Sequence, residues 1–422
     1  MLQVSKIREN KEIVIEGLKK RNFKDPESVI EEVLLVDEKR REIQKAMDDV
    51  LSEANQKAKM IGQMMKQGEK KQADSLKKES ASLKAKSKSF QEELSILENQ
   101  LSTLLYSIPN IPHLSVPAGR SSEDNEIVKE VGQKPDLQQK LPHWELIEKY
   151  DIIDFDLGNK ISGAGFPVYK GKGARLQRAL INFFLDEALN AGYLEIQPPI
   201  LVNEASGYGT GQLPDKEGQM YGVVDNFYLI PTAEVPITNL YRNVIMDIAD
   251  LPVRNVGYTP CFRREAGSWG AHVRGLNRLH QFDKVEIVQV CEPDQSYQIL
   301  ESMSEYVQHL LVQLELPYRV LKLCGGDMGF TSALTYDMEV YSAAQERWLE
   351  VSSVSNFETF QANRLMLRYK PENGKPQLLH TLNGSALALP RIVAAILENN
   401  QTQDGITIPS VLRPYTDFDL IN

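Results

Sequence analysis

Apolar side chains follow a heptad pattern in two stretches near the N-terminus. In residues 29–61 they alternate between spacings of four and three, and in residues 76–104 they recur every seven residues with intervening leucines. The two series are Val29, Val33, Val36, Ile43, Met47, Val50, Ala54 and Ile61, and then Leu76, Leu83, Phe90, Leu94, Leu97, Leu101 and Leu104. Such spacing is typical of helices that pack as a coiled coil, so we predict two long helices.

Helix start and stop signals enclose these two stretches. Asp-Pro-Glu-Ser at residues 25–28 precedes the first, and Ser-Ile-Pro-Asn at residues 107–110 follows the second. Between the stretches stand Gly62 and Gly68, and glycine weakens a helix. We therefore predict that the chain folds back on itself in this region as an antiparallel helical hairpin. Limbs of about 35 residues would each be roughly 50 Å long.

The heptads give way to a region without a sustained period. Residues 108–145 are rich in proline and polar side chains, which marks a boundary. We predict an N-terminal domain at residues 1–108, with its hairpin at about 27–105, a linker at 109–145, and a second domain at 146–422.

The second domain alternates helical and strand-like patterns. Residues 174–190 predict an amphipathic helix with Gly192 as its C-cap, and residues 193–197 predict a strand. Two prolines, Pro198 and Pro199, end that strand. Because proline cannot donate to a sheet ladder, we expect the strand near a sheet edge or a subunit boundary.

Residues 284–290 predict a buried strand that carries a carboxylate. Val285 and Ile287 would lie on one face, and Glu286 would share the other face with Val288 and Val290. With both faces apolar, a carboxylate is costly there unless a cation or hydrogen-bond donors meet it.

Two further segments place oxygen-bearing side chains on or just after strands. Thr232 and Glu234 follow a predicted strand at 227–230, where they suit either a polar ligand or the start of a helix. Residues 350–356 alternate, so Glu350 and Ser352 would face one way, and Val351 and Ser353 the other. Carboxylate and hydroxyl oxygens suit Mg²⁺, although a strand facing solvent would carry the same residues.

Residues 381–391 predict a polar strand end that runs into a helix. Pro390 suits the beginning of that helix and places Arg391 in its first turn. The helix dipole disfavours a cation there by several tenths of a kcal/mol, about the scale of one surface charge interaction. Arg391 therefore indicates an anion such as phosphate, with an exposed arginine as the alternative.

Composition adds bounds on the class of protein. The 422 residues are 42% hydrophobic and 25% charged, which is ordinary for a globular protein. No apolar run approaches the ~18 residues that a membrane span needs, and the N-terminus lacks an apolar signal core. The three cysteines have neither zinc-binding nor redox spacing, so we predict a cytoplasmic protein without structural zinc.

Lysines are concentrated between residues 57 and 88. Ten lysines stand against three acidic side chains there, so this segment carries +7 while the chain as a whole carries −10. The lysines are Lys57, Lys59, Lys66, Lys70, Lys71, Lys77, Lys78, Lys84, Lys86 and Lys88. A basic helical arm on an acidic protein favours a nucleic-acid partner, and a merely solvated helix face is the alternative. Without interleaved aromatic residues, the lysines should read shape and phosphates rather than bases.

Residues 262–286 hold the densest candidate chemistry. Arg263 and Glu265 open a loop broken by glycines, the loop contains Arg274 and Arg278, and it closes on the strand that carries Glu286. Arginines on a loop between two strands predict a site for a polyanion, with a carboxylate nearby to hold an amine. A solvated hairpin is the alternative for this segment taken alone.

Taken together, these segments resemble the seryl-tRNA synthetases of bacterial type, a family of class II aminoacyl-tRNA synthetases. Residues 263–286 resemble motif 2 of that class, residues 192–199 motif 1, and residues 384–391 motif 3. The N-terminal hairpin and the strings at 232–234 and 381–385 resemble the seryl family itself. The resemblance covers essentially the whole chain.

The resemblance implies a fold and an activity. The fold would be α+β, with an antiparallel sheet flanked by helices and a helical coiled-coil arm. The activity would be ATP-dependent attachment of L-serine to tRNA(Ser) through a seryl-adenylate, in a homodimer that uses Mg²⁺. Another class II amino-acid ligase and a non-catalytic RNA-binding relative are the alternatives. Serylation of selenocysteine tRNA as a second activity stays open.

The resemblance also implies roles for single residues. Arg263 would hold the α-phosphate and the serine carboxylate, Glu265 the adenine amino group, and Phe282 and Arg391 the two faces of adenine. The residues expected to bind ATP are Arg263, Glu265, Arg278, Phe282, Glu350, Ser353 and Arg391, and of these Glu350 and Ser353 would also bind Mg²⁺. The residues expected to bind serine are Thr232, Glu234, Arg263, Glu286, Asn383 and Ser385. The residues expected to bind tRNA are Lys57, Lys59, Lys66, Lys70, Lys71, Lys77, Lys78 and Lys84. Arg263 and Arg391 would be catalytic, by positioning and charge neutralisation.

Four positions depart from the pattern expected of bacterial members. Ala271 and His272 stand where an Arg-Asp pair is usual in the motif 2 loop, and Ala386 and Pro390 replace common glycines. We expect amino-acid activation to be unaffected, with any effect confined to contacts with the acceptor end of the tRNA.

Overall fold

The computed structural model describes residues 1–216, 218–264, 274–372 and 374–422. They fall into two units, which are described separately. The smaller unit comprises Leu2–Lys19 and Phe23–Pro109, and the larger comprises Met1, Lys20–Asn22 and Asn110–Asn422. The domain limits at residues 108 and 146 stay a prediction. Within the described ranges, none of the helices is both long enough and apolar enough to cross a membrane.

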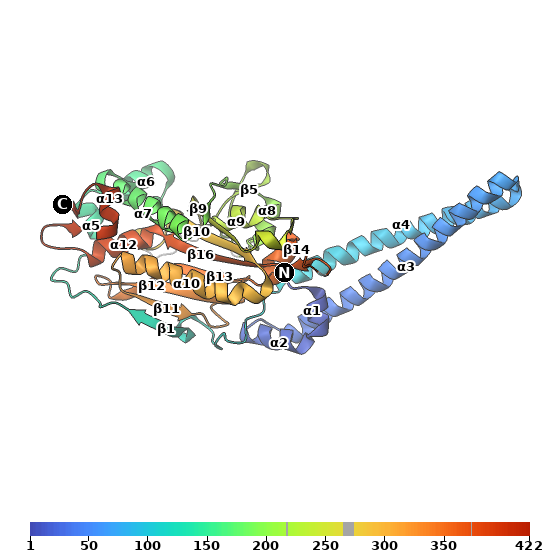
Figure 1. Cartoon of the computed structure of the whole chain (residues 1–422), viewed down its shortest axis with the longest axis horizontal. Helices are drawn as coiled ribbons and strands as arrows, with labels where there is room; N and C mark the ends of the chain where they lie inside the picture. The colour runs from blue at the N-terminus through green and yellow to red at the C-terminus, as the bar shows by residue number, and fades with distance from the viewer. Residues whose placement is uncertain (217, 265–273, 373) are drawn as a thin grey trace. The chain divides into compact units, whose positions relative to one another are not determined.

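The smaller unit is built from helices, and two of them form the predicted antiparallel hairpin (Figure 1). Its elements are α1 (Val4–Glu9), α2 (Lys11–Lys20), α3 (Pro26–Gln67) and α4 (Lys70–Ser107). Helix α3 has 42 residues, which corresponds to about 63 Å and exceeds the length expected from the sequence. The helix runs through Gly62 and ends at Gly68, whose φ of +82° places it in the left-handed region that glycine favours.

The heptad positions hold the hairpin together. Buried side chains from both limbs meet along its length, and they become small toward the turn, where the helices meet through alanine and serine. They are Val33, Val36, Val50 and Ala54 of α3, and Ala73, Ser80, Leu94, Leu101 and Leu105 of α4. The coiled-coil pattern therefore predicted the pairing, and the break at Gly62 and Gly68 between its two stretches predicted the antiparallel sense.

An eight-stranded sheet forms the centre of the larger unit. In spatial order its strands are β1 (Glu126–Val131), β11 (Tyr318–Lys322), β12 (Leu334–Ser342), β13 (Arg347–Asn356), β16 (His380–Ala388), β10 (Gln281–Cys291), β9 (Val253–Phe262) and β4 (Leu194–Glu195). All neighbours are antiparallel except β4 and β9. The predicted antiparallel α+β fold is confirmed. The strand before Pro198 and Pro199 lies at the sheet edge, as expected, but is only two residues long.

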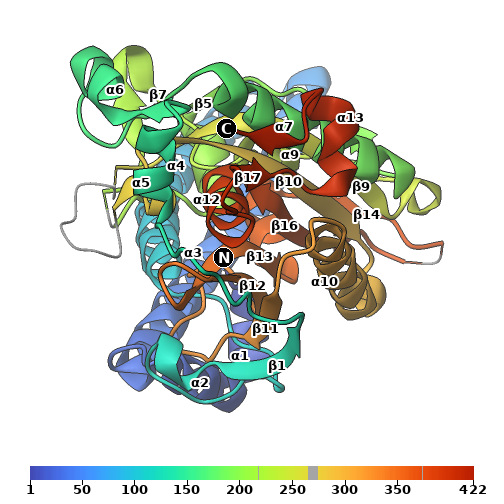
Figure 2. The same ribbon diagram turned by 90° about the vertical axis from the view of Figure 1, so that its left-hand side faces the viewer.

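Three helices cover one face of the sheet and enclose the main core (Figure 2). They are α7 (Gly171–Asn190), α10 (Ser296–Gln313) and α12 (Leu389–Asn399). Apolar side chains from all three pack against inward-facing strand residues in one continuous cluster, which includes Phe184, Leu300, Ile392, Ile287 and Val354. With this face filled by apolar side chains, the polar residues of the same strands point to the opposite face.

The remaining elements surround this sheet, and several of them form small sheets of two or three strands. The helices are α5 (His143–Lys149), α6 (Phe155–Ser162), α8 (Glu204–Thr210), α9 (Glu234–Asn239), α11 (Thr359–Leu365), α13 (Arg413–Thr416) and the short 3-10 helix η6 (Gly275–Asn277). The strands are β2 (Ile153–Asp154), β3 (Val168–Tyr169), β5 (Leu201–Asn203), β6 (Tyr221–Val223), β7 (Phe227–Leu229), β8 (Ile245–Met246), β14 (Arg368–Tyr369), β15 (Gln377–Leu378), β17 (Ile406–Thr407) and β18 (Leu420–Ile421).

Strand β10 is buried on both faces, as its pattern predicted. Val285 and Ile287 belong to the main core. On the opposite face, Val288 packs under α9, and Val290 packs against α11 and β14. The carboxylate of Glu286 lies on that second face and is 1% exposed.

Candidate active site

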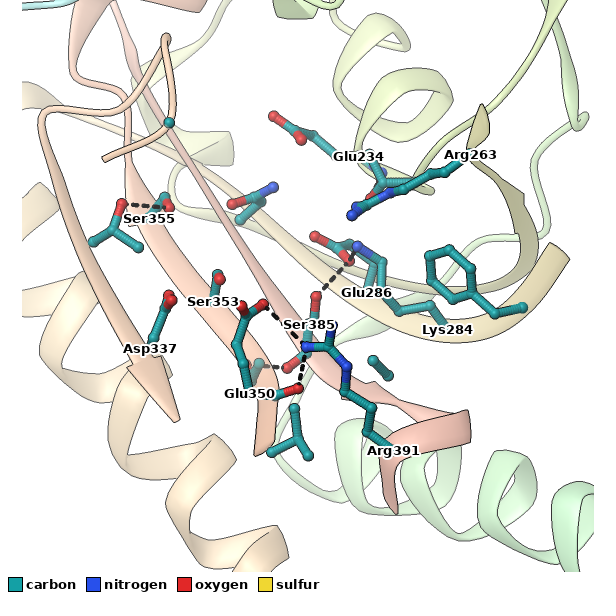
Figure 3. A pocket seen from close by; sticks show the side chains of 18 of the residues that line it. Glu234, Arg263, Lys284, Glu286, Asp337, Glu350, Ser353, Ser355, Ser385 and Arg391 are labelled. Carbon is teal, nitrogen blue, oxygen red and sulfur yellow. Dashed lines mark hydrogen bonds and ion pairs between the residues drawn. The ribbon is translucent and has the colours of Figure 1, made fainter. Parts of the chain in front are cut away.

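One cavity of about 710 Å³ lies on the face of the sheet opposite the main core. Strands β10, β12, β13 and β16 form much of its floor, and η6 and the first turns of α9 and α12 contribute to its walls (Figure 3). Every described residue predicted for ATP or serine lines it: Thr232, Glu234, Arg263, Arg278, Phe282, Glu286, Glu350, Ser353, Asn383, Ser385 and Arg391. Segments that lie far apart along the chain thus meet at one site. Glu265, Ala271 and His272 lie outside the described residues.

A buried ion pair lines the cavity. The ammonium nitrogen of Lys284 is 2.6 Å from Oε2 of Glu286, and the two side chains are 7% and 1% exposed. Ser385 on the neighbouring strand donates its hydroxyl to the same carboxylate oxygen at 3.3 Å. Lys284 is the cation that the buried carboxylate required, and it was not predicted. The available signal was the spacing of two residues, which places both side chains on one face of a strand.

Glu234 is a second buried carboxylate in the same cavity. It is the first residue of α9, its backbone N–H donates to Oγ1 of Thr232 at 3.3 Å, and its carboxylate accepts a hydrogen bond of 2.5 Å from the Gln361 amide. The segment therefore begins a helix, with Ala233 as its N-cap residue, and it also lines the cavity. Its binding of a polar ligand stays a prediction. Burial, together with the negative charge of Glu286, raises the pKa of Glu234 to about 7.

Gln361 was also missed, because a glutamine in a helical segment carries no sequence signal. It is fully buried in α11 and accepts a hydrogen bond of 2.7 Å from the Thr381 hydroxyl through its own carbonyl oxygen. That bond orients the amide so that its N–H group points to Glu234. Gln361 thus holds the Glu234 carboxylate, and Thr381 in turn holds the Gln361 side chain.

Arg263 and Phe282 lie next to each other at the ends of β9 and β10. The guanidinium carbon is 5.4 Å from the centre of the phenyl ring, and Nε donates to the carbonyl of Pro231 at 3.4 Å. This separation is within the range of cation–π contacts. An aromatic face and a cation therefore stand together in the part of the cavity that the ends of β9 and β10 form.

Arg391 reaches the same cavity from the first turn of α12, as predicted. Its Nε donates to the carbonyl of Asn277 at 3.2 Å, and Nη1 donates to the carbonyl of Glu350 at 2.5 Å. The Glu350 carboxylate lies 3.7 Å from Nη1. These acceptors offset the unfavourable position of a cation at a helix N-terminus. They also hold the guanidinium over the cavity floor (Figure 3).

The predicted alternation along residues 350–356 is wrong, and a β-bulge is the reason. Strand β12 pairs Glu339 with Glu350 but Met338 with Ser352, so Val351 is an extra residue without a partner. An inserted residue reverses the phase of the side chains that precede it. Glu350 and Ser353 therefore lie on the same face and both line the cavity, whereas regular alternation would have separated them.

Asp337 extends this group of oxygen atoms on the adjacent strand. It pairs with Ser353 across β12 and β13, it is 8% exposed, and its Oδ1 has no hydrogen-bond partner. Burial and then the charge of Glu350 raise its pKa well above the ordinary value, while a hydrogen bond with Ser353 acts in the opposite direction. An unpaired carboxylate oxygen beside a second carboxylate is an environment that suits a bound cation. The segment that carries Asp337 had no functional assignment from its residues alone.

The predicted metal ligands are therefore few but appropriate in kind. In the described part of the chain, no group of three or more His, Cys, Asp or Glu side chains converges on one point. Mg²⁺ usually binds through one or two carboxylates and completes its shell with water and phosphate oxygens. Glu350, Ser353 and the nearby Asp337 fit that mode of binding.

The lysines predicted to bind tRNA lie on α3 and α4, toward the turn that joins them (Figure 1). Two of them are engaged within the hairpin: Lys57 with Glu53 and Glu79, and Lys77 with Asp74 at 2.9 Å. The others are exposed, namely Lys59, Lys66, Lys70, Lys71, Lys78 and Lys84. A dense positive charge is thus available on this part of the hairpin.

Comparison with known proteins gives one consistent family. Residues 1–112 match the model of the seryl-tRNA synthetase N-terminal domain, and residues 222–400 match the tRNA synthetase class II core domain (G, H, P, S and T). The serine–tRNA ligase of Salinibacter ruber is 50% identical over 422 residues, which is 99% of this chain and 98% of that protein. The serine–tRNA ligase of Caldicellulosiruptor saccharolyticus is 49% identical, with 100% of both chains covered.

A solved structure shows the same likeness in three dimensions. The crystal structure of seryl-tRNA synthetase from Pyrococcus horikoshii complexed with ATP superposes with a TM-score of 0.89 at 34% identity. The superposition covers 100% of this chain and 99% of that one.

Proposed function

The chain belongs to the seryl-tRNA synthetase family, and from that premise we propose which residues carry the ATP-dependent joining of L-serine to tRNA. The chain is a serine–tRNA ligase with a class II core. The observation that carries the residue assignments is the meeting of Arg263, Glu286, Glu350 and Arg391 in one cavity. Adenylate formation needs positioning and charge neutralisation more than a nucleophilic side chain, and these groups supply both.

Serine binds at the end of the cavity that contains the buried carboxylates. Glu234 and Thr232 receive its ammonium group, and Arg263 holds its carboxylate. Glu286, Ser385 and Asn383 surround its hydroxyl and the neighbouring atoms. Alanine is rejected because, without the hydroxyl, these buried polar groups would be left unpaired. The ammonium of Lys284 holds the Glu286 carboxylate in place at 2.6 Å.

ATP binds across the middle of the cavity. Adenine stacks on Phe282 and is covered by Arg391, its amino group meets Glu265, and Arg263, Arg278 and Arg391 neutralise the phosphates. The serine carboxylate then attacks the α-phosphorus, and the bond to pyrophosphate breaks. In the second step the terminal ribose hydroxyl of the tRNA takes the seryl group, and AMP leaves. The chain's residues hold the reacting groups in line and disperse charge.

Glu350 and Ser353 hold the Mg²⁺ that accompanies ATP. When bound, the ion would supply positive charge to the triphosphate, which the arginines would otherwise have to supply alone. The support is the carboxylate and hydroxyl on one face of β13, together with the unpaired Oδ1 of Asp337 on β12.

The helical hairpin binds tRNA(Ser) through phosphates and shape. Its support is the exposed lysine set on α3 and α4, without stacking aromatics, in a chain of net charge −10. The reaction takes place in the cytoplasm, where the three free and buried cysteines suit a reducing environment.

A homodimer forms through motif 1 and the small sheet next to it. Apolar side chains are exposed on β4 and around β6 and β7, including Leu194 at 64%, Val224 at 86% and Phe227 at 43%. These exposed side chains support the proposal because a dimer interface would cover them. Sedimentation at micromolar concentration should give twice the chain mass, and a Leu194→Glu/Phe227→Glu variant should sediment as a monomer.

The substrate assignment is tested by ATP–pyrophosphate exchange with each of the twenty amino acids. Exchange with serine alone is expected. Exchange with another amino acid would refute the substrate, and the absence of exchange with all of them would favour a non-catalytic relative. Charging of tRNA(Ser) and of selenocysteine tRNA, measured in parallel, decides whether the second RNA is also a substrate.

A further inference from the structure

A histidine–glutamate pair outside the cavity is buried and has no place in the chemistry described so far. His143 begins α5 and Glu398 lies near the end of α12, and both side chains are 0% exposed. Nδ1 of His143 lies 2.6 Å from Oε1 of Glu398, and the backbone N–H of His143 donates to the same oxygen at 2.8 Å. Burying a carboxylate and an imidazole is costly, so their retention inside the core calls for a role.

The other side of the imidazole holds η6, which lies within the segment that resembles motif 2. The backbone N–H of Leu276 donates to Nε2 of His143 at 2.8 Å. Since Nε2 accepts this bond, it carries no proton, and the ring proton lies on Nδ1 toward Glu398. The contact is tight, because a Cβ at Gly275 would lie 2.3 Å from Nε2, and Gly275 has a φ of +65°.

A second route joins the same carboxylate to the same short helix. The side-chain amide of Gln345 donates to Oε1 of Glu398 at 2.9 Å, and its oxygen accepts from the Asn277 side chain at 3.1 Å. Ser342 donates its hydroxyl to the other oxygen of Glu398. Burial acts to raise the pKa of Glu398, but hydrogen bonds from His143 and Ser342 outweigh it and hold the pKa below the ordinary value.

These contacts close into a ring that includes the arginine of motif 3. The carbonyl of Asn277, one residue after Leu276, accepts from Nε of Arg391 at 3.2 Å. Arg391 and Glu398 are on the same helix, seven residues or about two turns apart. The ring therefore runs from Glu398 through His143 and η6 to Arg391, and returns along α12.

We propose that His143 and Glu398 are positioning residues for the ATP end of the cavity, because they fix η6 and, through the Asn277 carbonyl, the guanidinium of Arg391. The inference rests on the proposed function, in which Arg391 covers adenine and approaches the phosphates. Neither residue touches the cavity, so their effect passes through the backbone of η6.

Two substitutions of His143 separate this role from general packing. Gln at 143 can place its oxygen near the position of Nε2 and keep the bond from Leu276, whereas Asn can reach only toward Glu398. In serine-dependent exchange, H143N should raise the KM for ATP by about fivefold or more, the size of one buried hydrogen bond, while H143Q should stay within about twofold. The KM for serine should change little in both variants.

The melting temperature of each variant is measured alongside, with Ile396→Val as the control for loss of packing on α12. If H143N and H143Q lose ATP and serine affinity equally, or if neither loses ATP affinity, the pair is only structural and the proposal fails. If the His143 variants do not fold, Gln345→Met provides the test, because it removes the link between Glu398 and Asn277. Gln345 lies in a half-buried turn. The Gln345→Met variant should raise the KM for ATP by about twofold or more, and an unchanged KM would overturn the proposal.

Wild-type protein separates this proposal from the assignment on which it rests. Without serine-dependent exchange in the wild type, the proposed function itself fails. With normal wild-type exchange and no selective effect on ATP in the variants, only the positioning role is refuted.

Discussion

Glu234 and Glu286 are two buried carboxylates that act on each other across one cavity: burial and then the charge of Glu286 raise the pKa of Glu234 to about 7. The two groups differ in their partners. Glu286 has the ammonium of Lys284 at 2.6 Å, whereas Glu234 has the neutral amide of Gln361 at 2.5 Å. Glu234 is therefore the carboxylate that takes up a proton near neutral pH.

Serine binding should depend on pH through Glu234. The ionised carboxylate attracts the serine ammonium, so below pH 7 the KM for serine should rise by up to roughly tenfold per pH unit, while the KM for ATP changes less. The effect on folding has the opposite sign: because the folded pKa lies above the unfolded value of 4.5, this group's favourable contribution is lost as pH rises from 4.5 through about 7. Exchange kinetics between pH 6 and 8 measure the first effect. A Glu234→Gln variant should bind serine weakly at every pH, and the same pH slope in that variant would contradict the assignment.

Removing Lys284 should destabilise the protein by leaving a buried carboxylate without a cation. Lys284→Met should lower the free energy of unfolding by about 3–5 kcal/mol, the usual effect of breaking a buried pair on one side. The double variant Lys284→Met/Glu286→Gln removes both charges and should recover part of this loss. Urea denaturation measures both. A double variant no more stable than Lys284→Met would show that the pair does not carry the effect.

Arg263→Ala should abolish amino-acid activation. The guanidinium is assigned to the α-phosphate and the serine carboxylate, so exchange should fall by about 10²-fold or more. Arg264→Ala is the matched control, because Arg264 is the neighbouring arginine, is exposed, and does not line the cavity. Near-normal exchange in the Arg263 variant would remove it from the phosphate site.

The Mg²⁺ concentration that exchange requires should depend on Glu350 and Ser353, the two proposed oxygen ligands on β13. Glu350→Gln and Ser353→Ala should each raise the Mg²⁺ concentration for half-maximal exchange, by about three- to tenfold, because each removes one ligand. Ser304→Ala removes a buried hydroxyl from α10 on the other face and should leave this concentration unchanged. A Mg²⁺ titration of exchange rate at fixed ATP provides the measurement, and equal curves for all three variants would exclude the two ligands.

The lysine-bearing end of the hairpin should matter for RNA and not for activation. A variant without residues 57–88 should lose tRNA charging while serine-dependent exchange persists, because the cavity lies wholly within the larger unit. In point variants, Lys70→Ala/Lys71→Ala should weaken tRNA binding and make it less salt-dependent, by about one unit of slope for each phosphate no longer neutralised. Lys77→Ala should have a smaller effect, since that ammonium is paired with Asp74 at 2.9 Å. Loss of exchange in the deletion variant would contradict this separation.

Much of the fold was predictable from local patterns. The heptads predicted the hairpin, and the apolar faces around Glu286 predicted a buried strand with a compensating group. The position of the turn was less certain, because Gly62 is tolerated inside a long packed helix while Gly68 adopts the left-handed conformation that ends it. Which of the two glycines ends the helix is determined by helix packing, which the amino-acid composition does not show.

Local patterns predicted some residues of the candidate site and missed others. Arg263, Arg391, Glu286 and Glu350 follow from motifs that keep their spacing along the chain. Lys284, Asp337 and Gln361 were missed, since each acts through a partner that local patterns did not single out. The facing of Glu350 was mispredicted because a bulge depends on pairing with β12 and leaves no mark in the residues of β13.

The unpaired Val351 has a consequence for how this segment tolerates change. A deletion of that single residue would let the ladder close regularly and would turn Glu350 toward the helices, although every functional side chain remained encoded. A substitution at the same place would leave the phase intact. The number of residues in β13 therefore matters more than which residue stands at position 351. An insertion or deletion there would be more harmful than a substitution.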